Sequence, residues 1–270
     1  MSAAVLRVGA LVRSGWQAAA SYRVNMVLSI GSLVLALVPM YFIANALDPL
    51  MAESIAAEGG DYFAFLLMGM ITYLLLGAAV NTLPGALRGG IGNGTFEAML
   101  ATPTPLSTLL AGMTGYGLAW TGARALVLLV GGVVLGMSLA PGRILPALLI
   151  LVLLLLAYLP FGLMAAASVL AFRTAGPLPN IVLVVSALLG GVYYPTHVIP
   201  TWIQSISQAV PLTYGLRALR QTLLEGLPLR AVAGDVLILG VFAAALMAAG
   251  SYAFTRGLRY SRRVGSLAHY

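Results

Sequence analysis

Apolar segments alternate with short polar ones along the whole chain, and six of them are candidates to cross a membrane. An α-helix rises about 1.5 Å per residue, so about 20 apolar residues cross the hydrocarbon core of a bilayer, which is about 30 Å thick. The six segments are, in chain order, residues 26–47, 62–87, 106–140, 144–172, 177–194 and 231–255. The pattern therefore predicts an all-α polytopic membrane protein with six transmembrane helices.

The composition indicates the same class of protein. Of the 270 residues, 61% are hydrophobic and 8% are charged, whereas a soluble domain carries about 25% charged residues. The net charge of +7 would suggest a nucleic-acid partner for a soluble protein. Arginines at cytoplasmic helix ends explain that charge in a membrane protein, so we expect no nucleic-acid partner. The absence of cysteine excludes disulfides and thiolate metal sites.

The arginines predict the orientation, because positive charge favours the cytoplasmic side of a membrane. Three arginines precede the first apolar segment and four follow the last one. The loop after the first segment has no arginine but carries the acidic residues Asp48, Glu53, Glu58 and Asp61. We therefore place both termini in the cytoplasm and expect no cleaved signal peptide. All fourteen basic residues are arginine, a usage typical of GC-rich bacterial genomes, so we expect a bacterial plasma membrane.

Both ends of the chain are expected to lie outside the membrane core. In residues 1–25, apolar residues recur every three or four positions between arginines. The stripe is Val5, Val8, Val12 and Trp16. It predicts an amphipathic helix lying in the membrane interface, with a frayed cytoplasmic tail as the alternative. Residues 26–256 are then the membrane domain, and residues 257–270 are a basic cytoplasmic tail.

A polar segment, residues 88–105, interrupts the apolar pattern after the second predicted span. The preceding helix is expected to break at a run of glycines, Gly89, Gly90, Gly92 and Gly94. Thr95 can cap a new short helix within residues 94–103, and Glu97 lies in its first turn, where the helix dipole favours a carboxylate. Pro103 stops that helix. We therefore predict a cytoplasmic helix of about two turns.

The last outer segment, residues 195–230, is unusually long. Two short helices fit within residues 200–225, separated by Pro211. In the second helix four leucines share one face, and Arg217 and Arg220 are expected to point elsewhere. Neither helix is long enough to span, so both are predicted to re-enter the outer leaflet, where such backbone must be buried in protein or line a cavity.

One arginine, Arg124, lies within the third apolar segment. An arginine at bilayer depth costs at least about 2.5–3.5 kcal/mol on insertion scales. It can snorkel from the inner half of the membrane, form an ion pair, or face an aqueous path, and snorkelling is the simplest of the three.

The sequence lacks the residues that ATP hydrolysis, ion-coupled transport and intramembrane catalysis require. A phosphate-binding GxxxxGK[ST] loop needs a lysine, and the chain has none. The middle of each predicted span lacks the carboxylate that a proton- or sodium-coupled carrier usually needs. The two histidines lie outside the spans, so no catalytic residues and no metal ligands are predicted.

Two motifs resemble those of the ABC-2 type transporter permeases. Residues 94–103, GTFEAMLATP, are similar to the element that follows the second span in that family. Residues 190–220, which contain the Tyr-Tyr-Pro and Pro-Leu-Thr-Tyr sequences, are similar to its outer loop. The closest resemblance is to the drug-resistance and polysaccharide or lipid export branches. Residues 114–124, TGYGLAWTGAR, depart from the plain aliphatic sequence expected there.

The resemblance implies a permease subunit of an ATP-driven exporter for a drug, a lipid or a lipid-linked glycan. Two permease chains, expected to be a homodimer in membrane lipid, would bind two ABC ATP-binding subunits, which hold ATP and Mg²⁺; this chain would bind no cofactor. The implied ATPase-coupling residues are Gly94, Thr95, Glu97, Leu100, Thr102 and Pro103. The implied outer lid comprises Tyr193, Tyr194, Pro195, Pro200, Trp202, Pro211, Thr213, Tyr214, Arg217 and Arg220.

Simpler interpretations of these residues stay open. Glu97 can serve only its own helix dipole, and the outer aromatic residues can be ordinary interface anchors. Arg217 and Arg220 can favour an anionic cargo, or they can pair with Glu225 or lipid phosphate. The alternative functions are a secondary transporter or channel without ATP coupling, and a non-transporting membrane assembly or immunity protein.

Overall fold

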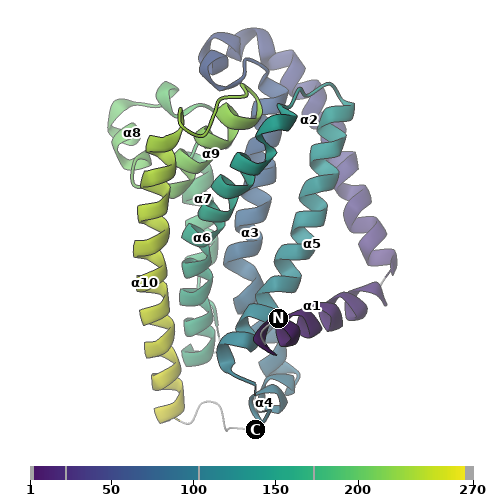
Figure 1. The fold of residues 1–270 in the computed structure, drawn as a ribbon, viewed down its shortest axis with the longest axis vertical. Helices are drawn as coiled ribbons and strands as arrows, with labels where there is room; N and C mark the ends of the chain where they lie inside the picture. The colour runs from purple at the N-terminus through teal and green to yellow at the C-terminus, as the bar shows by residue number, and fades with distance from the viewer. Residues whose placement is uncertain (1–2, 22, 103, 173, 265–270) are drawn as a thin grey trace.

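The computed structural model describes residues 3–21, 23–102, 104–172 and 174–264, and this part of the chain is helical without a strand. Five of its helices are long and apolar enough to cross a membrane. They run along the long axis of the molecule (Figure 1) and are α2 (Arg23–Ile55), α3 (Tyr62–Gly92), α5 (Leu106–Val134), α6 (Ile144–Phe172) and α10 (Ala233–Val264). The prediction of an all-α polytopic membrane protein is confirmed at this level.

A sixth apolar helix, α7 (Leu178–Leu189), occupies the position of the fifth predicted span but is shorter than expected. Its 12 residues rise about 18 Å, against a hydrocarbon core of about 30 Å. The helix ends at Gly190, and Gly191 turns the chain with a φ of +80°, which glycine adopts readily. That α7 crosses the membrane stays a prediction.

The first long helix extends beyond its predicted end at residue 47. It includes Asp48 and Glu53 and ends at Ile55, so the expectation that these two acids lie in a loop was wrong. Alanine, leucine, methionine and glutamate in this stretch favour helix. The Asp48 carboxylate also accepts a hydrogen bond of 2.9 Å from the backbone N–H of Tyr62, which ties the end of α2 to the start of α3.

The glycines of the polar segment do not break α3 where the sequence suggested. The helix continues to Gly92, and the chain turns at Gly94, which has a φ of +67°. Each glycine costs a helix only about 1 kcal/mol relative to alanine, and the fully buried Leu87 anchors this turn of α3 in the core.

The third long helix also ends early, at Val134 instead of residue 140. Gly136 has a φ of +107°, and the N–H of Met137 donates to the carbonyl of Gly132 at 2.9 Å. This bond satisfies a carbonyl that a helix end leaves without a partner.

The centre of the bundle is formed by α3 and α6. α6 packs against α3 on one side and α10 on the other, and α5 packs against α3. Tyr158 of α6 is fully buried, and its hydroxyl hydrogen-bonds to Ser186 of α7 at 2.6 Å, which attaches the short helix to the core. α2 lies at the edge of the bundle, with many of its apolar side chains exposed.

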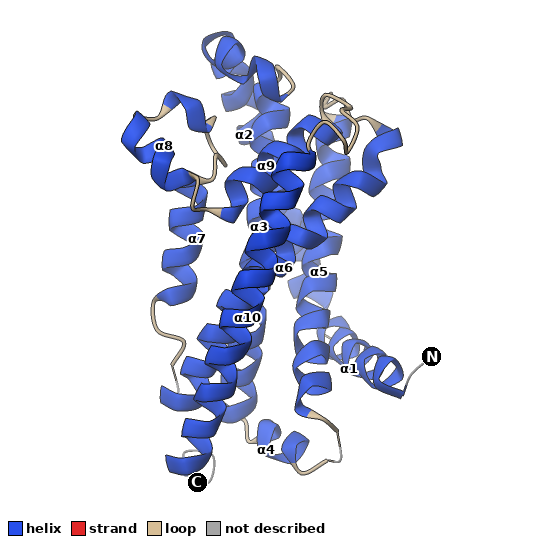
Figure 2. Ribbon diagram, turned by 60° about the vertical axis from the view of Figure 1, so that its left-hand side comes forward, coloured by secondary structure: helices blue, strands red, loops and turns tan. Residues whose placement is uncertain are grey.

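The N-terminal segment forms α1 (Ala3–Ala20), which crosses the lower part of α5 at a steep angle (Figures 1 and 2). A Cβ atom at Gly112 of α5 would lie 2.5 Å from the Leu11 side chain, so this close approach requires glycine. Trp16 and Trp120 meet edge to face, with ring centroids 5.8 Å apart. The segment is helical as predicted, and its location in the membrane interface stays a prediction. The unusual run 114–124 supplies part of its docking surface on α5.

The two segments that carry motifs lie at opposite ends of the bundle. α1, α4 (Thr95–Leu100) and the end of α10 gather at one end (Figure 1). α8 (Thr201–Ser207) and α9 (Pro211–Leu223) lie at the other end. The short 3-10 turns are η1 (Ala56–Glu58), η2 (Pro141–Arg143) and η3 (Thr196–Val198).

Candidate functional site

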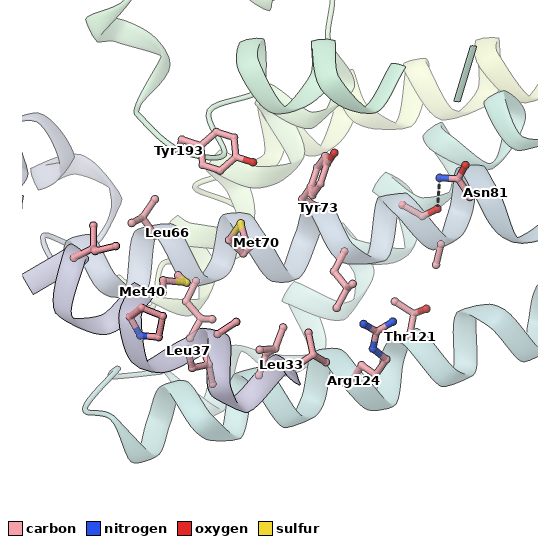
Figure 3. Close-up of a pocket in the computed structure, with 18 residues that line it drawn as sticks. Leu33, Leu37, Met40, Leu66, Met70, Tyr73, Asn81, Thr121, Arg124 and Tyr193 are labelled. Carbon is pink, nitrogen blue, oxygen red and sulfur yellow. Dashed lines mark hydrogen bonds between the residues drawn. The ribbon is translucent and has the colours of Figure 1, made fainter. Parts of the chain in front are cut away.

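A cavity of about 660 Å³ lies between α2, α3 and α5. Its wall is mostly apolar and includes Leu33, Leu37 and Met40 of α2 and Leu66 and Met70 of α3 (Figure 3). Cavities of roughly 300–1,000 Å³ with few polar groups are typical of sites for small organic molecules. The shape and lining of this cavity suit a largely hydrophobic ligand.

The two ends of the cavity differ in polarity. Figure 3 shows Tyr193 beside Leu66 and Met70 at one end, and Asn81, Thr121 and Arg124 at the other. The Asn81 amide donates to the carbonyl of Gly77, one turn earlier in α3, at 3.0 Å.

Arg124 lines this cavity, and it has no hydrogen bond or ion pair to the described part of the chain. Its Nε atom is buried, and among the described residues it has no hydrogen-bond acceptor. The arginine lies ten residues before Val134, a distance of about 15 Å along α5. Within the described chain the ion-pair interpretation finds no support, whereas the side chain does line a cavity.

The end of the cavity near Tyr193 is held in place by Arg220 of α9, a residue that is only 1% exposed. Its guanidinium donates to the Glu58 carboxylate at 2.9 Å and to the carbonyls of Gly191 and Phe65, each at 2.9 Å. It also lies 3.3 Å from the centroid of the Phe65 ring. Arg220 therefore joins α9 to η1, to the start of α3 and to the loop that carries Tyr193.

The expectation that Arg220 points away from the apolar face of its helix was wrong. Position 220 is four residues after Leu216 and three before Leu223, so all three share a face that packs inward. Burial lowers the pKa of Arg220 to about 10, partly opposed by the nearby Glu58 carboxylate. The guanidinium is still charged at neutral pH.

The other arginine of the predicted lid, Arg217, is paired at the surface. Arg217 forms a bidentate ion pair with Asp235 at the start of α10, and its Nε donates to that carboxylate at 2.8 Å. Hydrogen bonding to Asp235 raises the pKa of Arg217. The suggested pairing of the two arginines with Glu225 was wrong, because Asp235 and Glu58 are the partners.

The remaining residues of the predicted outer lid bind the segment together. Thr213 donates to the carbonyl of Ser207 at 2.8 Å, so the first turn of α9 holds the end of α8. The hydroxyls of Tyr194 and Tyr214 donate to the carbonyls of Leu188 and Gln208, at 2.6 Å and 3.0 Å.

The prolines and the tryptophan of this segment differ in exposure. Pro195 and Pro211 are buried, and Pro211 is the first residue of α9, where a missing N–H costs nothing. Pro200 is exposed, and Trp202 is 68% exposed. Trp202 therefore stands on the surface of α8, while Tyr193 is the aromatic residue of this group that lines the cavity.

A short helix forms where predicted, as α4, directly after the turn at Gly94, and its cytoplasmic location stays a prediction. The Thr95 hydroxyl donates to the carbonyl of Gly90 at 3.3 Å, so it bonds to the end of α3, and Thr102 donates to Met99 at 2.7 Å. The side chains of Glu97 and Leu100, and all of Pro103, lie outside the described residues.

Comparison with protein families explains this arrangement of helices. A family model described as ABC-2 type transporter matches residues 7–224, most of the chain. The chain belongs to the ABC-2 type transporter family. Comparison with curated proteins gave no significant match.

Membership makes this chain the membrane subunit of an ABC transporter, a multi-pass membrane protein of a family that works with an ABC ATP-binding partner. It is a transport subunit. In the described part of this ABC-2 chain, His, Asp and Glu side chains do not form a cluster that could hold a metal ion.

Sequence reasoning missed three elements of the site. The first is Glu58, which the sequence did not distinguish from the other three acids of its segment. A buried arginine requires a partner, and that requirement is the signal that could have pointed to an acid. Gly69 is required where α3 passes the Val192 carbonyl, because an added Cβ would collide with that oxygen. Asn81 could have been noticed as a polar residue within an apolar span, one turn after Gly77.

Proposed function

We propose that this chain is the permease of an ATP-driven exporter that moves a hydrophobic or amphipathic cargo outward across a bacterial plasma membrane. In the proposed complex two copies of the chain bind two ATP-binding subunits, and both termini lie in the cytoplasm. Membership of the family establishes that the chain is an ABC transporter subunit. The outward direction of transport and the composition of the complex are proposed here.

One observation carries the proposal: α3 connects α4, the cavity and the outer segment. α3 is a continuous helix of 31 residues, about 46 Å long. It contacts α4 at one end, supplies a large part of the cavity wall along its length, and meets Arg220 at its other end. A displacement of α4 by a partner would therefore reach the cavity and the Tyr193 loop through one element.

The outer segment would act as the lid. Tyr193 lines the cavity, and the backbone beside it accepts hydrogen bonds from Arg220 of α9 and from the Tyr62 hydroxyl of α3. A shift of α3 relative to α9 would change these bonds and move Tyr193. Closure and opening of the outer end would thus follow the position of α3.

Pairing of two chains is supported by the exposed apolar faces of the outer helices. α2 exposes large apolar residues along its length, and α7 exposes Ile181, Val184 and Leu188. These faces suit either lipid or a second copy. The proposed homodimer predicts two permease chains and two ATP-binding chains in the purified complex.

The proposal is tested by copurification and by a charge reversal in α4. We expect a tagged chain to bring down an ABC ATP-binding subunit, and Glu97→Arg to reduce both copurification and export at least tenfold. Glu53→Arg is the matched control, because Glu53 is exposed at the opposite end of the bundle. The coupling proposal fails if no ATPase copurifies and Glu97→Arg leaves export unchanged; a role of Glu97 limited to its own helix dipole predicts a change of only about 0.3–1 kcal/mol in stability.

A further inference from the structure

Arg124 has no role in the coupling or lid described above, yet it is an arginine within a membrane helix. Its Nε is buried and lacks an acceptor among the described residues. The two ion pairs of the described chain belong to Arg217 and Arg220. A half-buried guanidinium whose Nε lacks an acceptor is unfavourable in a low-dielectric environment, so a bound anion would stabilise this site.

The neighbours of Arg124 can complete an anion site. Thr121 precedes it by three residues on α5, is 8% exposed and lines the same cavity. Asn81 of α3 also lines this end of the cavity, and one of its amide hydrogens is bonded to the Gly77 carbonyl (Figure 3). A guanidinium binds phosphate or carboxylate oxygens in pairs, and a hydroxyl and an amide can donate further hydrogen bonds.

The rest of the cavity is suited to an apolar chain. From Arg124 the wall continues along α2 and α3 past Leu33, Leu37, Met40 and Met70 to Tyr193 (Figure 3). Methionine side chains are flexible and adapt to ligands of irregular shape. A ligand that fills this space has one anionic end and a long hydrophobic part.

We propose that the cavity binds an anionic amphiphile, with a phosphate or carboxylate on Arg124 and its hydrophobic chain along α2 and α3. Arg124 lies four residues after Trp120 on α5, about 6 Å along the helix, and Trp120 contacts Trp16 of α1. The head group would bind where Arg124 and Thr121 line the cavity. A cationic amphiphile would place like charges together at Arg124 and is disfavoured.

The test measures binding to the purified permease without an ATPase, so its result is independent of the coupling proposal. The probes are phosphatidylglycerol and diacylglycerol carrying the same fluorescent acyl chain, and the second has no phosphate. We expect saturable binding of the phosphatidylglycerol probe, weakened about tenfold to 100-fold by Arg124→Gln, because a hydrogen bond to a charged group contributes about 1.5–3 kcal/mol. Arg230→Gln makes the same change in net charge at an exposed position and should leave binding unchanged.

Two further variants keep the test decisive if Arg124→Gln unfolds. Arg124→Lys keeps the charge and should retain part of the binding. Gly77→Leu projects a side chain into the cavity, since a Cβ there has no atom within 4 Å, and should block the apolar part. Equal binding of the two probes, or unchanged binding in both Arg124→Gln and Gly77→Leu, would overturn the proposal.

The source of the amphiphile is then distinguished in proteoliposomes that contain the copurified ATPase. If the bound probe is cargo, ATP should transfer it to the opposite leaflet in the wild type and not in Arg124→Gln. If it is a resident lipid, it should stay bound during ATP hydrolysis. Either result requires the Arg124 site.

Discussion

At the scale of single residues, the burial of Arg220 determines how the end of the bundle that carries α8 and α9 is built. Four hydrogen bonds from its guanidinium reach Glu58 and the backbone of two separate segments. Removing one partner of a buried ion pair leaves the other charge without compensation, which typically destabilises a protein by about 3–5 kcal/mol. Arg217, with 41% of its side chain exposed, depends far less on its partner.

We therefore predict that Arg220→Gln and Glu58→Gln each destabilise the purified chain by about 3–5 kcal/mol. The double variant should lose less than the sum of the two, because the residues form one pair. Thermal unfolding in detergent measures these differences. Arg217→Gln is the control and should lower stability by only about 1 kcal/mol; an equal effect of Arg217→Gln and Arg220→Gln would contradict this account.

At the scale of helices, contacts depend on glycines that permit close approach. Gly69 lies where α3 meets the carbonyl of Val192, next to the Arg220 guanidinium, and a side chain there must displace backbone. Gly77, two turns later in the same helix, faces open space. Glycine is thus required at one of these positions and not at the other.

This difference predicts opposite effects of the same substitution. Gly69→Ala should destabilise the chain by about 1–3 kcal/mol through overpacking and loosen the Tyr193 loop. Gly77→Ala should stabilise it by about 0.5–1 kcal/mol, because alanine favours helix over glycine. The unfolding temperatures of the two variants measure this difference. A Gly69→Ala chain as stable as Gly77→Ala would refute the predicted collision with the Val192 carbonyl.

At the scale of the whole molecule, α4 and the outer segment lie at opposite ends of the bundle (Figure 1). The proposed orientation puts Asn93, beside α4, in the cytoplasm and Thr201, at the start of α8, outside. Both residues are exposed, and the chain has no native cysteine. Each introduced cysteine is therefore the single thiol of its variant.

We expect a membrane-impermeant maleimide to label Thr201→Cys in intact cells and Asn93→Cys only after permeabilisation. Equal labelling of both variants in permeabilised cells is the control for reactivity. Labelling of Asn93→Cys in intact cells would contradict the proposed orientation and indicate the opposite one.

The sequence predicted what depends on local pattern and missed what depends on distant partners. Hydrophobic segments located the long helices, and the turn at Gly94 with the residues after it located α4. The persistence of α3 through Gly89 and Gly90 could not be predicted, because burial of Leu87 compensates for glycine there. The partner of Arg220 could not be predicted either, since Glu58 lies 162 residues away in the chain.

That separation has a consequence for how the protein is made. A ribosome adds about 5–20 residues per second, so the 162 residues between Glu58 and Arg220 take about 8–32 s to synthesise. Throughout this interval the Glu58 carboxylate and the Phe65 carbonyl lack the hydrogen bonds from the Arg220 guanidinium. The end of the bundle that contains Glu58 is therefore completed late in translation, when α9 has been synthesised.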